Sequence, residues 1–231
     1  MPYKQIFFDL DHTLWDFETN SEETLQDMFY EFELDKKGIP DFKIFHDTYV
    51  VHNAKMWERF RKGFINRHEL RWKRIWLTLL DFKIVDEPLV QHISDRYLEV
   101  LPTKTNLFPD TIEILDYLAG KNYPLHLITN GFEKTQQQKI AHSHIDHYFT
   151  YMITSEAAGS LKPDRRIFDY ALQKAGCNAE DALMIGDTLD VDILGAQNAG
   201  IDQVYYAAER PVSGILPTFY IASLSELKRI L

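Results

Sequence analysis

The chain of 231 residues is 45% hydrophobic, so it can bury a full core, either as one large domain or as one domain that carries a smaller one. Its formal net charge of -10 argues against binding to a nucleic-acid polymer or an anionic membrane, because both bind basic surfaces. Cys177 is the only cysteine, and we see neither a signal peptide nor the roughly 18 consecutive apolar residues of a membrane span. These features predict a cytoplasmic protein.

The first apolar run predicts a buried strand that ends in two carboxylates. Ile6, Phe7 and Phe8 follow one another without polar alternation, which is typical of a strand buried on both faces of a parallel sheet. Asp9 and Asp11 come directly after this run. Ligands of open α/β sheets bind at the carboxyl ends of strands, and two carboxylates held close together repel unless they share a cation or a proton. We therefore expect a functional site at this strand end.

Residues 17–104 have the pattern of an inserted helical domain. Asn20 and Ser21 predict a helix N-terminus, after which apolar residues recur at helical spacing. Further helices are expected over residues 42–61, 67–80 and 88–98. A crossover between adjacent parallel strands needs only about a dozen residues, so this longer segment indicates a separate domain over the carboxyl end of the first strand.

After Pro109, strands and helices alternate. Strands are expected over residues 124–129, 148–154, 182–185, 203–206 and 219–222. Helices are expected over residues 110–118, 133–141, 164–174 and 191–199, with a short terminal helix from Leu224. This alternation predicts an α/β fold with a doubly wound parallel sheet. The predicted core domain comprises residues 1–16 and 105–231, and residues 17–104 form the inserted domain.

Polar groups follow several of these strands. Because parallel strands end at one edge of a sheet, groups far apart in the sequence can meet there. The residues expected at this edge are Asp9, Asp11, Thr129, Asn130, Gly131, Lys162 and Asp187. Carboxylates, a hydroxyl, backbone amides and an ammonium together suit a phosphoryl group and a hard divalent cation such as Mg²⁺.

Four segments resemble the motifs of the haloacid dehalogenase (HAD) superfamily, in the same order along the chain. They are Asp9-Leu10-Asp11-His12-Thr13-Leu14, Ile128-Thr129-Asn130-Gly131, Lys162-Pro163 and Gly186-Asp187-Thr188-Leu189-Asp190-Val191-Asp192. The resemblance implies a Rossmann-like core, and the inserted segment is similar to the helical cap of the C1 type. A cap pattern that includes Trp57 and Arg71 most resembles the YjjG/YfnB group, whose better known members are 5'-nucleotidases.

The resemblance implies catalysis through an aspartyl-phosphate. Asp9 would be the nucleophile, and Asp11 would donate a proton to the leaving group and later accept one from water. Thr129 and Lys162 complete the implied catalytic set. The implied substrate-binding residues are Thr129, Asn130, Gly131 and Lys162 in the core, with Trp57 and Arg71 in the cap.

The resemblance also implies a Mg²⁺ cofactor. Asp9 and Asp187 would bind the ion through their side chains, and Asp11 through its backbone carbonyl. Asp192 would bind through a water molecule or steady Lys162. The ion would orient the phosphate and offset its repulsion from the carboxylates.

Together these roles predict a Mg²⁺-dependent phosphatase of small phosphomonoesters, with nucleoside 5'-monophosphates as the expected substrates. A haloacid dehalogenase and a phosphomutase are the alternatives within the superfamily, and an inactive phosphate-binding module is a further one. Asp11 and Asp187 speak against the dehalogenase, because the family's dehalogenases lack the acid at the position of Asp11 and need no metal. The expected partner is a small phosphorylated metabolite, and the protein is expected to be a monomer or a homodimer.

Overall fold

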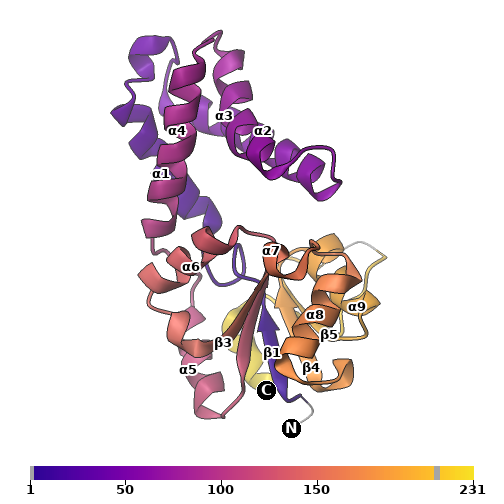
Figure 1. Cartoon of the computed structure of the whole chain (residues 1–231). Helices are drawn as coiled ribbons and strands as arrows, with labels where there is room; N and C mark the ends of the chain where they lie inside the picture. The colour runs from indigo at the N-terminus through magenta and orange to yellow at the C-terminus, as the bar shows by residue number, and fades with distance from the viewer. Residues whose placement is uncertain (1–2, 211–213) are drawn as a thin grey trace. The chain divides into compact units, whose positions relative to one another are not determined.

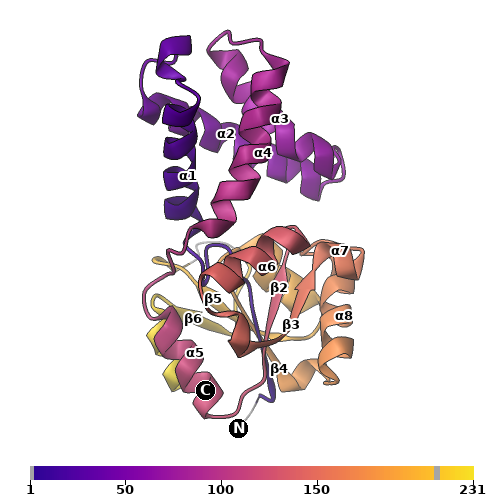
Figure 2. The same ribbon diagram turned by 60° about the vertical axis from the view of Figure 1, so that its left-hand side comes forward.

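The chain folds into two compact units. The computed structural model describes residues 3–210 and 214–231; residues 1–2 and 211–213, which the sequence assigns to the core domain, lie outside the described ranges. One unit comprises Met1–Phe17 and Thr105–Leu231, and the other comprises Glu18–Lys104. The first contains a sheet with helices on both sides, and the second is helical (Figures 1 and 2). No helix within the described ranges has both the length and the apolar character needed to cross a bilayer.

The first unit is built on a six-stranded sheet with the order β3-β2-β1-β4-β5-β6. The strands are β1 (Gln5–Phe8), β2 (Leu125–Thr129), β3 (Phe149–Thr154), β4 (Ala182–Gly186), β5 (Asp202–Tyr206) and β6 (Phe219–Ile221). Every pairing between neighbouring strands is parallel. The α/β fold class with a doubly wound parallel sheet, predicted from the alternation of strands and helices, is therefore confirmed.

Strand β1 lies in the middle of this sheet. Ile6, Phe7 and Phe8 have no exposed surface, as expected for a strand covered on both faces. Phe8 pairs with Leu127 of β2 on one side and with Ile185 of β4 on the other. The strand order therefore reverses at β1, and in sheets of this kind such a switch point opens the crevice in which ligands bind.

Helices cover both faces of the sheet. Helices α5 (Thr111–Gly120) and α6 (Glu133–His142) lie on one face, and α8 (Arg165–Ala175) and α9 (Leu194–Asn198) lie on the other (Figures 1 and 2). A short helix, α7 (Ser155–Ala158), follows β3. The hydrophobic core beneath α8 and α9 joins side chains of the strands to side chains of the helices, among them Phe7, Ile128, Ile153, Phe168 and Ala196.

The second unit consists mainly of the helices α1 (Phe17–Glu31), α2 (Phe42–Arg61), α3 (Arg67–Asp81) and α4 (Glu87–Val100). Three of them are preceded by an N-cap residue whose side chain accepts a hydrogen bond from the first turn: Asp41, Asn66 and Asp86. At α3 the bond is reciprocated, because the Glu69 side chain accepts from the Asn66 backbone amide.

The helix N-terminus predicted at Asn20 and Ser21 is wrong, because α1 already begins at Phe17. Both side chains are buried within the helix, and the Ser21 hydroxyl forms a 2.8 Å hydrogen bond with the Tyr97 hydroxyl of α4. Partners within the unit therefore satisfy a polar residue that would otherwise favour a helix end.

Two helices expected near the C-terminus also differ in form from the prediction. A π-helical turn over Leu189–Ile193 precedes α9, and the terminal segment Leu224–Arg229 is a 3-10 helix. The π-helical turn matters for the site, because it carries Asp192.

Candidate active site

The strand ends of β1, β2 and β4 each contribute a polar residue to one edge of the sheet. Asp9 directly follows β1, Thr129 is the last residue of β2, and Asp187 directly follows β4. The Asp9 backbone amide donates a 2.9 Å hydrogen bond to the Ile185 carbonyl of β4, so the pairing of β1 with β4 continues to Asp9. The backbone of the sheet therefore holds these three residues, which are far apart in the sequence, next to one another.

Lys162 connects these strand ends. Its Nζ donates to Asp9 Oδ1 at 2.5 Å, to Asp192 Oδ1 at 2.6 Å and to the Ile128 carbonyl at 2.8 Å, which accounts for all three ammonium donors. The side chain is only 2% exposed. Asn130 holds the backbone of Lys162 in a reciprocal pair: its Nδ2 donates to the Lys162 carbonyl at 3.0 Å, and its Oδ1 accepts from the Lys162 amide at 2.8 Å.

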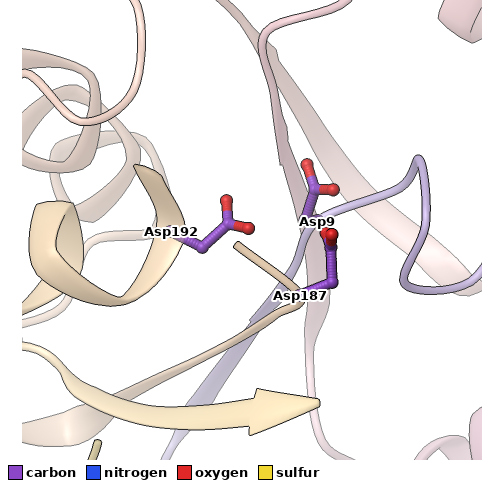
Figure 3. A group of neighbouring side chains, drawn as sticks. All are labelled: Asp9, Asp187 and Asp192. Carbon is purple, nitrogen blue, oxygen red and sulfur yellow. The ribbon is translucent and has the colours of Figure 1, made fainter. Parts of the chain in front are cut away.

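Three carboxylates share the space beside Lys162. One oxygen of each of Asp9, Asp187 and Asp192 lies within 4.8 Å of one oxygen of each of the others. Figure 3 shows Asp9 at the end of β1, Asp187 after β4, and Asp192 on the helical turn that follows. Two hydroxyls hold Asp187, because Thr13 donates to its Oδ1 at 3.3 Å and Thr188 donates to its Oδ2 at 3.0 Å.

The approach of Asp192 depends on the absence of a side chain at Gly186. A Cβ atom at position 186 would lie 2.5 Å from the Asp192 Cβ and 2.6 Å from its Cγ. The Thr188 backbone amide donates to Asp192 Oδ2 at 3.0 Å and fixes the carboxylate in this position. The glycine thus serves close packing rather than an unusual backbone conformation.

Burial and mutual repulsion perturb this carboxylate group. Burial raises the pKa of Asp9 well above its ordinary value; Lys162 opposes that rise, and Asp192 and Asp187 add to it. Burial, with the charge of Asp192, raises the pKa of Asp187 to about 6. Burial alone would lower the pKa of Lys162, but the Asp192 and Asp9 carboxylates outweigh it and raise the pKa. Lys162 is therefore an ammonium that stabilises the anions around it.

Asp11 is held apart from this group by helix α6. Its Oδ1 accepts from Lys139 Nζ at 2.5 Å, and its Oδ2 accepts from Gln136 Nε2 at 2.9 Å. The Gln136 amide also donates to the Thr129 hydroxyl at 2.7 Å. That hydroxyl accepts a further hydrogen bond from the Gly131 amide at 3.0 Å, which leaves its own proton to be donated.

Sequence comparison decides the family. The model of the haloacid dehalogenase-like hydrolases matches residues 3–200, which is most of the chain. The chain belongs to the haloacid dehalogenase-like hydrolase family. The resemblance drawn from the four motifs is thereby confirmed, and the protein is a hydrolase.

Individual HAD relatives match most or all of the chain. It is 32% identical to "Pyrimidine 5'-nucleotidase YjjG" of Escherichia coli over 100% of this chain and 99% of that protein. It is also 32% identical to "Pyrimidine 5'-nucleotidase PynA" of Streptococcus pneumoniae over 89% of this chain and 84% of the relative. Among solved structures, the magnesium-bound putative HAD-hydrolase YfnB of Bacillus subtilis superposes with a TM-score of 0.88 at 27% identity, covering 100% and 99% of the two chains.

The donor set of this HAD site fits a hard cation. All three grouped side chains offer carboxylate oxygens, the ligand type that Mg²⁺ prefers. Burial and mutual repulsion raise the pKa values of Asp9 and Asp187 despite the Lys162 ammonium, and a divalent ion would favour their charged forms. The Asp11 carboxylate lies outside the group, and the contact expected between its backbone carbonyl and a metal stays a prediction.

The remaining site residues expected from the sequence lie in two places. The Gly131 amide, expected to bind a phosphoryl oxygen, donates to Thr129 in this structure. Trp57 and Arg71 lie in the helical unit, where Trp57 contacts the Phe60 ring and Arg71 lies 3.8 Å from the Asp95 carboxylate. Their role as substrate-binding residues stays a prediction.

The sequence reasoning missed three residues at this site. Thr13 belongs to a recognised motif but received no role, and Gln136 and Lys139 lie outside every motif. Gln136 and Lys139 are three residues apart on α6, so they share one face of the helix. No feature of the sequence singles these two out, because every residue from 133 to 139 is polar.

Proposed function

We propose that this enzyme hydrolyses small phosphomonoesters, preferentially nucleoside 5'-monophosphates, with Mg²⁺ as its cofactor. The observation that carries the proposal is the buried Lys162, bonded to Asp9 and Asp192 beside a further carboxylate, Asp187. Such a group is costly to bury and is suited to binding a phosphoryl group together with a cation. The names of the relatives YjjG and PynA, both pyrimidine 5'-nucleotidases, support the nucleotide as substrate.

In the first step, Asp9 takes the phosphoryl group. One carboxylate oxygen is bonded to Lys162, and the other attacks phosphorus, so that an Asp9 O–P bond forms as the P–O bond to the leaving group breaks. Asp11 acts as the general acid and transfers its proton to the departing alkoxide oxygen. The products are the free alcohol and an aspartyl-phosphate.

In the second step, a water molecule hydrolyses the aspartyl-phosphate. Asp11, now a carboxylate, accepts a proton from the water molecule. The oxygen of that water attacks phosphorus, and the Asp9 O–P bond breaks. Inorganic phosphate leaves, and Asp9 and Asp11 return to their starting forms. Alternation between acid and base requires that Asp11 stay oriented toward both the leaving oxygen and the water.

The other residues bind and neutralise the phosphoryl group. The ammonium of Lys162 offsets negative charge on both the phosphate and Asp9, and the Thr129 hydroxyl has a proton to donate to a phosphoryl oxygen. The side chains of Asp9 and Asp187 would hold Mg²⁺, together with the Asp11 backbone carbonyl. Asp192 would bind the ion through water or steady Lys162, to which it is already bonded. When bound, the ion supplies positive charge that reduces repulsion between the substrate and the carboxylates.

The test is a phosphate-release assay of the purified protein. Nucleoside 5'-monophosphates and sugar phosphates are assayed for released phosphate and 2-haloacids for released halide, each with Mg²⁺ and with a chelator. We expect Mg²⁺-dependent phosphate release, fastest for the nucleotides, and its loss on chelation. Asp9→Asn should lower the rate by several orders of magnitude, because an amide is a far weaker nucleophile.

Asp190→Asn is the matched control for Asp9→Asn. Asp190 is an exposed carboxylate on the π-helical turn that also carries Asp192, and it lies outside the carboxylate group. Its substitution should leave the rate near that of the wild type. Halide release that resists the chelator, or an unchanged rate in Asp9→Asn, would contradict the proposal.

A further inference from the structure

We infer that Gln136 and Lys139 are positioning residues that hold the Asp11 carboxylate for its proton transfers. The inference rests on the proposed function, in which Asp11 is the general acid and base. Neither residue belongs to the four motifs, and both come from α6 rather than from a strand end. Both bond to the Asp11 carboxylate, and Gln136 also bonds to the Thr129 hydroxyl.

Each oxygen of Asp11 receives one donor from α6. Lys139 Nζ lies 2.5 Å from Oδ1, and Gln136 Nε2 lies 2.9 Å from Oδ2. Two bonds from one rigid helix restrict rotation of the carboxylate about both of its side-chain torsions. A carboxylate oxygen has two lone pairs, so one bond to each oxygen still leaves a position that can carry the transferred proton.

Lys139 is buried for this contact. Its side chain is 3% exposed, and its Nζ lies 4.2 Å from the ring centroid of Trp15 and 5.3 Å from that of Phe17. Aromatic faces attract an ammonium and restrict its position. Both rings belong to the loop and helix start that follow Asp11, so the segment that carries the carboxylate also holds its cationic partner.

Gln136 links the proton-transfer residue to the phosphate-binding strand end. The same amide nitrogen donates to Asp11 and to the Thr129 hydroxyl. The side chain passes over Gly131, where a Cβ atom would collide with the Gln136 side chain. The glycine of the second motif is therefore required for this bridge, an explanation independent of any turn geometry.

A leaving-group comparison distinguishes positioning of a general acid from structural support. An alkyl phosphomonoester such as a nucleoside 5'-monophosphate needs a proton on its leaving oxygen, whereas the phenolate of p-nitrophenyl phosphate leaves readily without one. We measure kcat/KM for both substrates with Mg²⁺ in wild type, Lys139→Met and Gln136→Leu. Because general acid catalysis contributes about 10²–10⁴-fold, each variant should lose at least about tenfold more activity on the alkyl substrate.

Lys134→Met is the matched control, because Lys134 lies exposed on the same helix. It should leave both kcat/KM values unchanged. Gln136→Leu replaces a neutral side chain by one of similar size, so it tests the inference even where Lys139→Met reduces folding. Equal losses on both substrates, or no loss, in a folded variant would overturn the positioning role while the wild type remains active. A wild type that releases no phosphate from either substrate would instead overturn the proposed function.

Discussion

The sheet unit and the helical unit of the chain contain ion pairs that differ in solvent exposure. In the sheet unit, the Lys162 and Asp192 side chains are each 2% exposed, although they are 30 residues apart in sequence. In the helical unit, ion pairs such as Lys43 with Asp47 join neighbours on one helix, with side chains 81% and 58% exposed. The Lys162 pair of the sheet unit is therefore buried, whereas this pair of the helical unit stays in water.

Burial of charge in the helical unit follows another pattern. Arg74 is buried there, and its Nη1 donates to the Asn53 amide oxygen at 3.0 Å while its guanidinium lies 4.9 Å from the Tyr97 ring centroid. A neutral amide and an aromatic ring thus accommodate one isolated cation. The sheet unit instead gathers several carboxylates around Lys162, an arrangement that packing alone does not require and that costs desolvation free energy.

The largest effect outside the ionisable groups is expected for Gly186→Ala. The added Cβ would overlap Asp192, so either the carboxylate or β4 must move. We expect a destabilisation of about 1–3 kcal/mol, the usual cost of overpacking, together with at least a tenfold fall in phosphate release. Urea unfolding and the phosphate-release assay measure the two effects.

Gly120→Ala provides the comparison for Gly186→Ala. A Cβ at position 120, the last residue of α5, would meet no atom within 4 Å, so this variant should be as stable as the wild type or slightly more stable. If Gly186→Ala kept wild-type stability and activity, the close approach of Asp192 would not matter to the site.

A smaller effect is expected from His126, a buried ionisable group of the sheet unit outside the site. Burial lowers the pKa of His126 to about 4, below the value of about 6.5 in an unfolded chain. The unfolded state then binds the proton first, so the stabilisation is complete above about pH 6.5 and is lost as the pH falls toward 4. Between pH 7 and pH 5 this linkage should cost about 1–2 kcal/mol of the free energy of unfolding.

Urea unfolding at both pH values, in wild type and in His126→Gln, isolates this contribution. The variant should lose less stability on acidification than the wild type does. His92→Gln is the control, because His92 is exposed on α4 of the helical unit, and its acid-induced loss should match that of the wild type. An identical pH dependence in all three proteins would show that His126 is as accessible to protons as His92.

The fold and the carboxylate group could be predicted from the sequence because both depend on short, local sequence patterns. Unbroken apolar runs mark the buried strands, and a parallel sheet brings the residues that follow them to one edge, so the proximity of Asp9 and Asp187 follows from strand order. The motifs then identified Lys162, which the sheet alone would not, because a lysine ahead of a helix usually faces solvent.

The contacts of Gln136 and Lys139 could not be predicted from the sequence in the same way. Residues 133–139 are polar on every side, which is the pattern of a solvated helix, and only tertiary packing buries two of them. The start of α1 was missed for a related reason. Ser21 has the chemistry of a helix cap, and its buried hydroxyl bonds to Tyr97, which is distant in sequence.

The smallest effect is expected from the exposed pair Lys43 and Asp47. Nζ lies 2.5 Å from Oδ2, as close as Lys162 lies to Asp9, yet both side chains remain in water, where screening and lost side-chain entropy cancel most of the attraction. A double-mutant cycle with Lys43→Ala and Asp47→Ala, measured by urea unfolding, should therefore give a coupling free energy within experimental error. A clear coupling that persisted in 1 M salt would mean that solvent exposure does not weaken this ion pair relative to the buried pair of Lys162 and Asp9. The distance between the charges alone would then govern how strongly they interact.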